Sequence, residues 1–253
     1  MKSKYLMLLF VLVLTSCASK KDLFYLQDAV ENNETEIKYQ SMTVQPNDIL
    51  KIDIETLIPE AARPYNQSVT GSGAVPNLLV MQLEGYLVNK DGTINFHNLG
   101  EISVVNLTVV EVAEKLKNEL TSGGHLNNPK VNVRIVNSKV TVLGEVRNPG
   151  TFPFTEHNVS LFQALGYAGD LTINGKRDDI IITREVDGSR QITHVDLTNT
   201  EFMNSEFYYL KPNDIIIVNP NKSKVTSSGY IGNIGILLSV TSVLLSSIIL
   251  LSR

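Results

Sequence analysis

One phrase occurs twice in this chain, and it constrains the fold more than any other feature of the sequence. QPNDILKIDI occupies residues 45–54, and KPNDIIIVNP occupies residues 211–220. In each copy the proline presets the backbone for a tight turn, and the following Asn and Asp can hydrogen-bond their own backbone. An apolar, β-branched run comes next. Each copy therefore predicts a turn that starts a β-strand.

The two predicted strands differ in how they are buried. After the first turn, residues 49–54 alternate between apolar and polar side chains, which predicts a strand with one buried face. After the second turn, residues 215–218 are apolar throughout, which predicts a strand that is covered on both faces. Taken alone, the repeat shows only that two strands begin in the same way.

Length and charge limit the classes of function. A chain of 253 residues can form one large domain or two small ones. The formal net charge is −4, and no cluster of Lys and Arg occurs. Nucleic-acid binding needs a basic face to neutralise phosphates, so a nucleic-acid partner is excluded.

The N-terminus has the pattern of an export signal. Residues 1–16 combine a basic start with a ten-residue apolar run, and Cys17, the only cysteine, follows directly. This order resembles a bacterial lipoprotein signal peptide, in which Cys17 would be lipidated and become the mature N-terminus. An ordinary secretory signal that happens to contain a cysteine is the alternative. Residues 17–41 are polar and predict a tether with little fixed structure.

The C-terminus contains a long segment without charge. Residues 231–251 hold no charged side chain over 21 positions, which predicts a transmembrane helix. Small and weakly polar residues recur there at spacings of three and four, so that they share one helical face. This stripe consists of Gly232, Gly235, Ser239, Ser242 and Ser246. It would either line a water-filled lumen or pack closely against a neighbouring helix in an oligomer.

The segments between these ends predict a compact α+β fold. Thr108 with Glu111, and Ser160 with Gln163, fit the capping box that starts a helix, and each pair precedes an amphipathic run. The dipeptides at 91–92 and 187–188 are both Asp-Gly and predict β-hairpins. Helices of this kind cover one face of a mixed sheet.

Taken in order, the motifs resemble those of a known family, the bacterial outer-membrane polysaccharide export lipoproteins of the Wza type. The matching segments are QPNDILKIDI, YLVNKDGTINFHNLGEISVVNLTVVEVAEKL, NPKVNVRI, VTVLGEVRNPGTF, LFQALGYAGDLT and LKPNDIIIVNP. The resemblance implies an export domain over 42–136, one β-grasp-like SLBB domain over 137–220, and a C-terminal transmembrane helix within 221–253. The turn motifs that carry it, with structural roles, are Pro46, Asp48, Pro149, Gly150, Pro212 and Asp214.

The resemblance also implies a function. It predicts a homo-oligomeric ring that forms a porin-like conduit for capsular polysaccharide or exopolysaccharide, with an inner-membrane copolymerase or tyrosine kinase as partner. It places the chain in the outer membrane, attached to lipid through Cys17 and the C-terminal helix, with periplasmic domains. A carbohydrate-binding adaptor in the periplasm, which scaffolds an assembly complex without forming a pore, is the second interpretation. The charge-free C-terminal segment favours that alternative.

No group of residues in the sequence predicts catalysis. The four histidines, at 97, 125, 157 and 194, lack the i, i+4 spacing of a helical metal site. The stretch TGSGA at 70–74 matches neither a dinucleotide-binding nor a Walker motif. Ser160 has no G-x-S-x-G surroundings. We therefore expect a protein that is not an enzyme and has no cofactor or metal.

Overall fold

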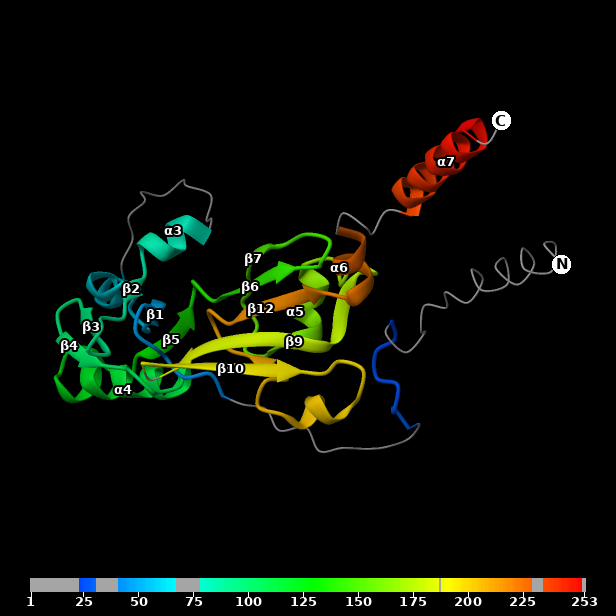
Figure 1. Ribbon diagram of the computed structural model, residues 1–253. Helices are drawn as coiled ribbons and strands as arrows, with labels where there is room; N and C mark the ends of the chain where they lie inside the picture. Colours follow the sequence, from blue (N-terminus) through cyan, green and yellow to red (C-terminus); the bar gives the residue numbers. More distant parts are fainter. Residues whose placement is uncertain (1–22, 31–40, 67–77, 187, 229–233, 252–253) are drawn as a thin grey trace.

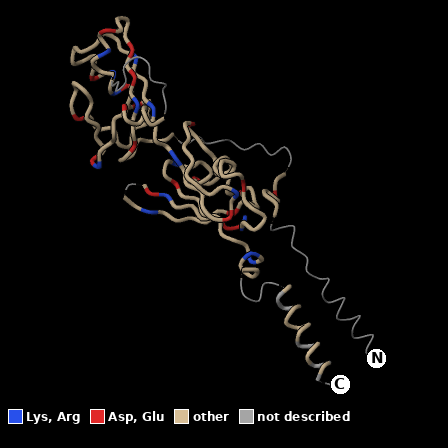
Figure 2. Tube along the Cα trace, turned by 90° about the horizontal axis from the view of Figure 1, so that it is seen from above, with Lys and Arg blue, Asp and Glu red and all other residues tan. Residues whose placement is uncertain are grey.

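The computed structural model describes residues 23–30, 41–66, 78–186, 188–228 and 234–251. Two groups of elements, each with its own hydrophobic core, follow one another along the chain (Figure 1). We call the elements from β1 to β5 the first domain and those from β6 to β12 the second domain. Charged residues of both signs are spread over both domains, and α7 contains none (Figure 2).

The first domain is built around β1 (Ile49–Glu55), the strand that follows the first copy of the phrase. β1 lies between β2 (Tyr86–Leu87) and β5 (Lys130–Ile135), and both pairings are antiparallel. Leu50, Ile52 and Ile54 are buried while the residues between them are more exposed, so the predicted alternation is confirmed. A separate two-stranded ladder joins β3 (Thr93–Phe96) to β4 (Gly100–Ser103).

Helices complete the first domain. The long helix α4 (Val109–Ser122) buries Val112, Leu116 and Leu120 against the sheet. Its capping box at Thr108 is present, with the hydroxyl accepting from the Glu111 N–H. The other helical elements of this domain are short: α2 (Pro59–Ala62), η2 (Arg63–Tyr65) and α3 (Leu78–Leu83).

The second domain is a five-stranded mixed sheet in the order β10-β9-β12-β6-β7. Its strands are β6 (Lys139–Gly144), β7 (Gly150–Pro153), β9 (Gly175–Val186), β10 (Ser189–Val195) and β12 (Ile215–Pro220). β12, which follows the second copy of the phrase, is the central strand, parallel to β6 and antiparallel to β9. Both copies of the phrase therefore start a strand with a partner on each side.

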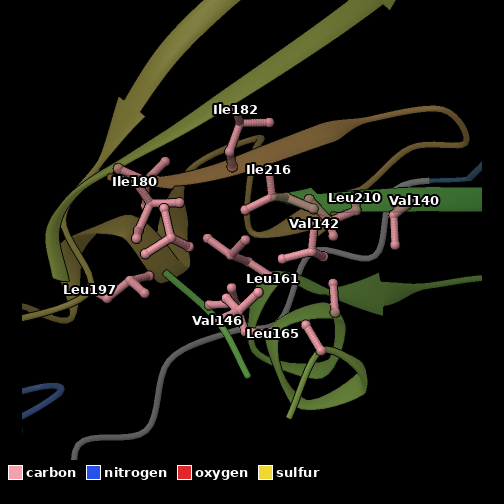
Figure 3. Close-up of a cluster of buried hydrophobic side chains, with 14 of the residues drawn as sticks. Val140, Val142, Val146, Leu161, Leu165, Ile180, Ile182, Leu197, Leu210 and Ile216 are labelled. Atoms are coloured by element: carbon pink, nitrogen blue, oxygen red, sulfur yellow. The ribbon is translucent and has the colours of Figure 1, made fainter. Parts of the chain in front are cut away.

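One short helix closes the core of the second domain. α5 (Leu161–Tyr167) begins at the predicted Ser160–Gln163 capping box. Figure 3 shows Leu161 and Leu165 of α5 together with Val142 of β6 and Ile216 of β12. Smaller elements are β8 (Val159–Ser160), which pairs with β11 (Tyr209–Leu210), and η3 (Glu201–Asn204). The chain then continues through α6 (Lys222–Ser228) to α7 (Ile234–Leu251).

One of the two predicted hairpins is wrong in its pairing. β9 and β10 do form a hairpin, with Val186 opposite Ser189. The turn at Asp91-Gly92 also forms, but the strands beside it turn to other partners: β2 pairs with β1, and β3 pairs with β4. β2 pairs with β1 and not with β3 because β1, the central strand of the buried sheet, supplies hydrogen-bond partners for it.

The predicted C-terminal transmembrane helix is wrong. None of the helices in the described part of the chain is both long and apolar enough to cross a membrane. α7 has 18 residues in the described part of the chain, and six of them are Gly, Ser or Thr.

Part of the predicted tether has a fixed place. Residues 23–30, the N-terminal strap, lie against the second domain. The Leu26 and Gln27 N–H groups donate to the carbonyls of Leu197 and Thr198 at 3.1 and 2.6 Å. The Tyr25 hydroxyl donates to Asp170 at 2.6 Å. The expectation of little fixed structure therefore does not hold for this stretch, because aromatic and aspartate side chains within the polar sequence find partners.

Candidate functional site

The two copies of the phrase fold into the same turn. In the first PND turn (residues 45–48) Asp48 Oδ2 accepts from the Gln45 N–H at 2.9 Å, and in the second (residues 211–214) Asp214 Oδ2 accepts from the Lys211 N–H at 2.9 Å. Asn47 and Asn213 have φ of 72° and 68°, the left-handed region that Asn tolerates better than most residues. The carboxylate thus closes each turn, and the strand begins at the next residue.

A cleft between the two domains brings these turns together. It has a volume of about 1190 Å³, and both PND turns line it. The tip of the β9–β10 hairpin forms another part of its wall. Amide and hydroxyl side chains are frequent in the lining and include Gln45, Asn47, Asn106, Asn158, Ser189 and Asn213. Such groups can donate hydrogen bonds to, and accept them from, a ligand rich in hydroxyls.

Ammonium and guanidinium groups also line the cleft. Lys90 comes from the first domain, and Lys211 and Arg190 come from the second. Arg190 is paired with Glu185 of the same hairpin, its Nε lying 2.8 Å from the carboxylate. Lys90 and Lys211 have no ion pair among the residues that the structure describes. The cleft can therefore receive a polar ligand from both walls.

The two aspartates differ in their surroundings. Asp214 is bound by the buried guanidinium of Arg184, with Nε and Nη2 at 3.0 and 2.7 Å from the carboxylate oxygens. Asp48 is 2% exposed, and no cation within the described ranges forms an ion pair with it. Burial raises the pKa of Asp48 to about 6, against a smaller opposing effect of the Gln45 N–H. An arginine thus neutralises the aspartate of the turn in the second domain, and no described cation does so in the first.

The structure brings some of the predicted motif residues together and separates others. Pro46, Asp48 and Pro212 line the cleft, whereas Asp214 closes the second turn without being part of the lining. Pro149 and Gly150 stand apart, at the start of β7, where Gly150 pairs with Val142. Their role is to begin an edge strand of the sheet.

The residues predicted at the two ends of the chain are not part of the cleft. Cys17 and Gly232 lie outside the described residues. Gly235, Ser239, Ser242 and Ser246 lie on α7, where the hydroxyls of Ser242 and Ser246 donate to carbonyls of their own helix at 2.9 and 2.8 Å. The lumen or packing role of this stripe stays a prediction.

No described group of three or more His, Cys, Asp or Glu side chains could hold a metal ion. The histidines have separate neighbours. His125 lies 3.2 Å from the Tyr65 hydroxyl, and His194 contacts Asp179. The described residues that line the cleft include no histidine and no cysteine.

Sequence reasoning missed two residues of the second domain, one beside the second PND turn and one in the sheet behind it. Arg184 lies near the end of β9, and the pairing of β9 with β12 places it beside Asp214. Gly144 has φ of 91°, and a Cβ there would lie 2.0 Å from the Val218 carbonyl oxygen. Gly144 is the first residue of the motif GEVRNPG, and a glycine at that position could have indicated a backbone conformation that other residues do not tolerate.

Comparison with known families matches both domains. The polysaccharide biosynthesis/export protein family matches residues 37–136, and the SLBB domain family matches residues 139–193. Together the two matches cover more than half of the chain. The second match ends within β10, although the sheet continues to β12.

Curated relatives agree with these matches. The capsule polysaccharide export outer membrane protein CtrA of Neisseria meningitidis is 27% identical over 192 residues, which are 75% of this chain and 47% of that protein. The EPS I polysaccharide export outer membrane protein EpsA of Ralstonia solanacearum is 27% identical over 152 residues, 58% of this chain and 39% of its own length. This chain thus spans less than half the length of each relative. It belongs to the polysaccharide biosynthesis/export protein family and carries an SLBB domain behind its export domain.

Proposed function

We propose that this protein takes part in the export of capsular polysaccharide or exopolysaccharide at the outer membrane, as a subunit of an oligomeric conduit. The observation that carries the proposal is the order of the two matched domains along the chain, export domain then SLBB domain. The names of the relatives, which are outer membrane export proteins for capsule and for EPS I, support the location and the cargo.

The cleft suggests how the chain would handle such a cargo. Its amide, hydroxyl and ammonium groups offer many weak polar contacts instead of one tight site. Transport needs binding that is favourable enough to admit the polymer and weak enough to release it. The chain would therefore act by enclosing and guiding the polymer, without catalysis and without a cofactor.

Anchoring and assembly complete the proposal. Acylation of Cys17 would attach the chain to the membrane, and the strap would hold the second domain close to that anchor, since Leu23 is only six positions further along. Copies of the chain would associate in a ring, and an inner-membrane copolymerase with a tyrosine kinase would deliver the polymer.

The cleft also fits a second candidate function. A polar cleft that is complete within one chain can bind carbohydrate without any ring. The protein would then be a periplasmic adaptor that scaffolds the polysaccharide assembly complex.

Deletion of the gene in its native host, with complementation by the full chain, separates these functions. For a conduit, we expect surface polysaccharide to disappear while finished polymer accumulates in the periplasm. For an adaptor, polymer synthesis itself should fall and no periplasmic polymer should collect. Unchanged surface polysaccharide in the deletion strain would refute both. A Cys17→Ser version tests the anchor, because it should leave the outer-membrane fraction and fail to complement.

A further inference from the structure

The linker between the two domains is very short, and its end residues are each held by one domain. Residues 136–138 join β5 to β6 (Figure 1). The Val136 N–H donates to the Ile49 carbonyl of the first domain at 3.0 Å. The Ser138 carbonyl accepts from the Phe154 N–H of the second domain at 3.1 Å, and Ser138 is buried. Within the linker, only backbone rotation at the central residue could change the angle between the domains.

That central residue, Asn137, is bound to the first PND turn. Its Oδ1 accepts from the Ile49 N–H at 2.9 Å, and its Nδ2 donates to the Asn47 carbonyl at 2.9 Å. The side-chain amide therefore bridges the last part of the turn and the first residue of β1. Both of its hydrogen-bonding groups are used in this contact, which removes the rotational freedom that an isolated linker residue would have.

The second PND turn binds the start of β6, directly after the linker. The Asn213 N–H donates to the carbonyl of Lys139, the residue that follows the linker, at 2.7 Å. The Thr141 N–H donates to the Asp214 carbonyl at 3.0 Å. Thus one copy of the phrase binds the linker through Asn137, and the other binds the residue next to it.

A side chain from the start of the first domain adds a contact across the boundary. Met42 packs against the hydrophobic core of the second domain. The same residue lines the interdomain cleft on one side and a smaller groove of about 640 Å³ on the other. A change in the angle between the domains would have to break this contact as well as those of the linker.

We propose that the two PND turns and Asn137 form a clamp that fixes the angle between the two domains and with it the width of the cleft. The first turn holds the linker through Asn137, and the second holds the start of β6 directly after it, so that each domain secures one end of the connection. A cleft of fixed width does not need to close on its ligand, so binding carries no cost of ordering two domains. The inference concerns the conformation of the chain and does not depend on the proposed cargo.

Distances between spin labels in the full chain test this clamp. One label is placed on α4 through Asn118→Cys and the other on β9 through Asp178→Cys, with Cys17→Ser to avoid a third label. Double electron–electron resonance then gives the distance distribution. We expect a single narrow distribution for the unmodified linker and one at least twice as wide for Asn137→Ala.

Asn66 provides a matched control. Its amide makes the same pair of bonds to β1, accepting from the Ile54 N–H and donating to the Ile54 carbonyl at 2.8 Å each, but it lies within the first domain. Asn66→Ala should leave the distribution narrow. An equally narrow distribution in Asn137→Ala, or equal broadening in both variants, would overturn the proposal. If Asn137→Ala does not fold, Asn137→Asp keeps the acceptor and loses the donor, and it must broaden the distribution for the clamp to stand.

Discussion

At the scale of single residues, the two PND turns are alike in hydrogen bonding and differ in charge. Arg184 neutralises Asp214 and also donates to the carbonyls of Glu206 and Tyr209, so its removal would leave the buried Asp214 carboxylate without a cation. Asp48 has no such cation among the residues described, and its carboxylate is nearly inaccessible to water. Ionisation of Asp48 therefore destabilises the folded protein.

This cost predicts a pH dependence of stability. The folded-state pKa of Asp48, about 6, lies above its ordinary value of 3.8, so the group lowers the free energy of unfolding as the pH rises between these values. Asp48→Asn keeps an oxygen for the Gln45 N–H and cannot ionise. At pH 7 we expect this variant to be more stable than wild type by up to about 3 kcal/mol, with a smaller difference near pH 4. Urea unfolding at both pH values measures it, and parallel pH profiles would contradict the assignment.

At the scale of elements, the parallel pairing of β6 with β12 depends on close approach of two backbones. The last residue of β6, Gly144, lies opposite Val218. Gly144 has a positive φ, and a Cβ at this position would lie only 2.0 Å from the Val218 oxygen. No other residue can therefore replace this glycine without a shift of the backbone. Gly150, on the neighbouring strand β7, has its nearest contact at 3.7 Å and no positive φ.

Two alanine variants compare these glycines. Gly144→Ala should lower the free energy of unfolding of the second domain by more than about 3 kcal/mol, because the backbone must shift and the φ is unfavourable. Gly150→Ala should cost less than about 1 kcal/mol. Urea denaturation followed by circular dichroism gives both values. Equal losses would show that the close approach does not limit this sheet.

At the scale of the whole molecule, the N-terminal strap connects the region of the proposed anchor to the second domain. Tyr25 packs edge-on against Phe162 and covers the guanidinium of Arg177, 5.2 Å from its ring centre. Asp28 accepts from the Thr200 N–H at 2.7 Å. These contacts join residues near the start of the chain to the second domain.

Hydrogen exchange tests the strap. Tyr25→Ala removes the ring, the cation–π contact and the bond to Asp170, so the Leu26 and Gln27 amides should exchange at least about tenfold faster, in keeping with the value of one half-buried aromatic side chain. Tyr25→Phe retains the ring and should show a smaller effect. Phe24→Ala, at a side chain that is 57% exposed, is the matched control and should leave exchange unchanged. Unaltered exchange in Tyr25→Ala would mean that the backbone hydrogen bonds and Asp28 hold the strap without the Tyr25 ring.

Local patterns in the sequence determined the parts of this protein that depend on neighbours in the chain. Both PND turns, the alternation along β1 and the two capping boxes follow from the choices of residue within a few positions, and each is present in the structure. The order of motifs also determined the family. Where two pairings competed, as at the turn of Asp91-Gly92, local signals predicted the turn and failed to predict the partner strand.

Only the tertiary structure decided what the repeated phrase does. Residues 45–48 and 211–214 are far apart in sequence, and nothing local indicates that they would lie on either side of the linker or share a cleft. The pairing of Arg184 with Asp214 and the approach of Gly144 to Val218 depend likewise on which strands become neighbours in the sheet. Side-chain period and turn chemistry specify an element, whereas contacts between elements follow from the packing of the complete core.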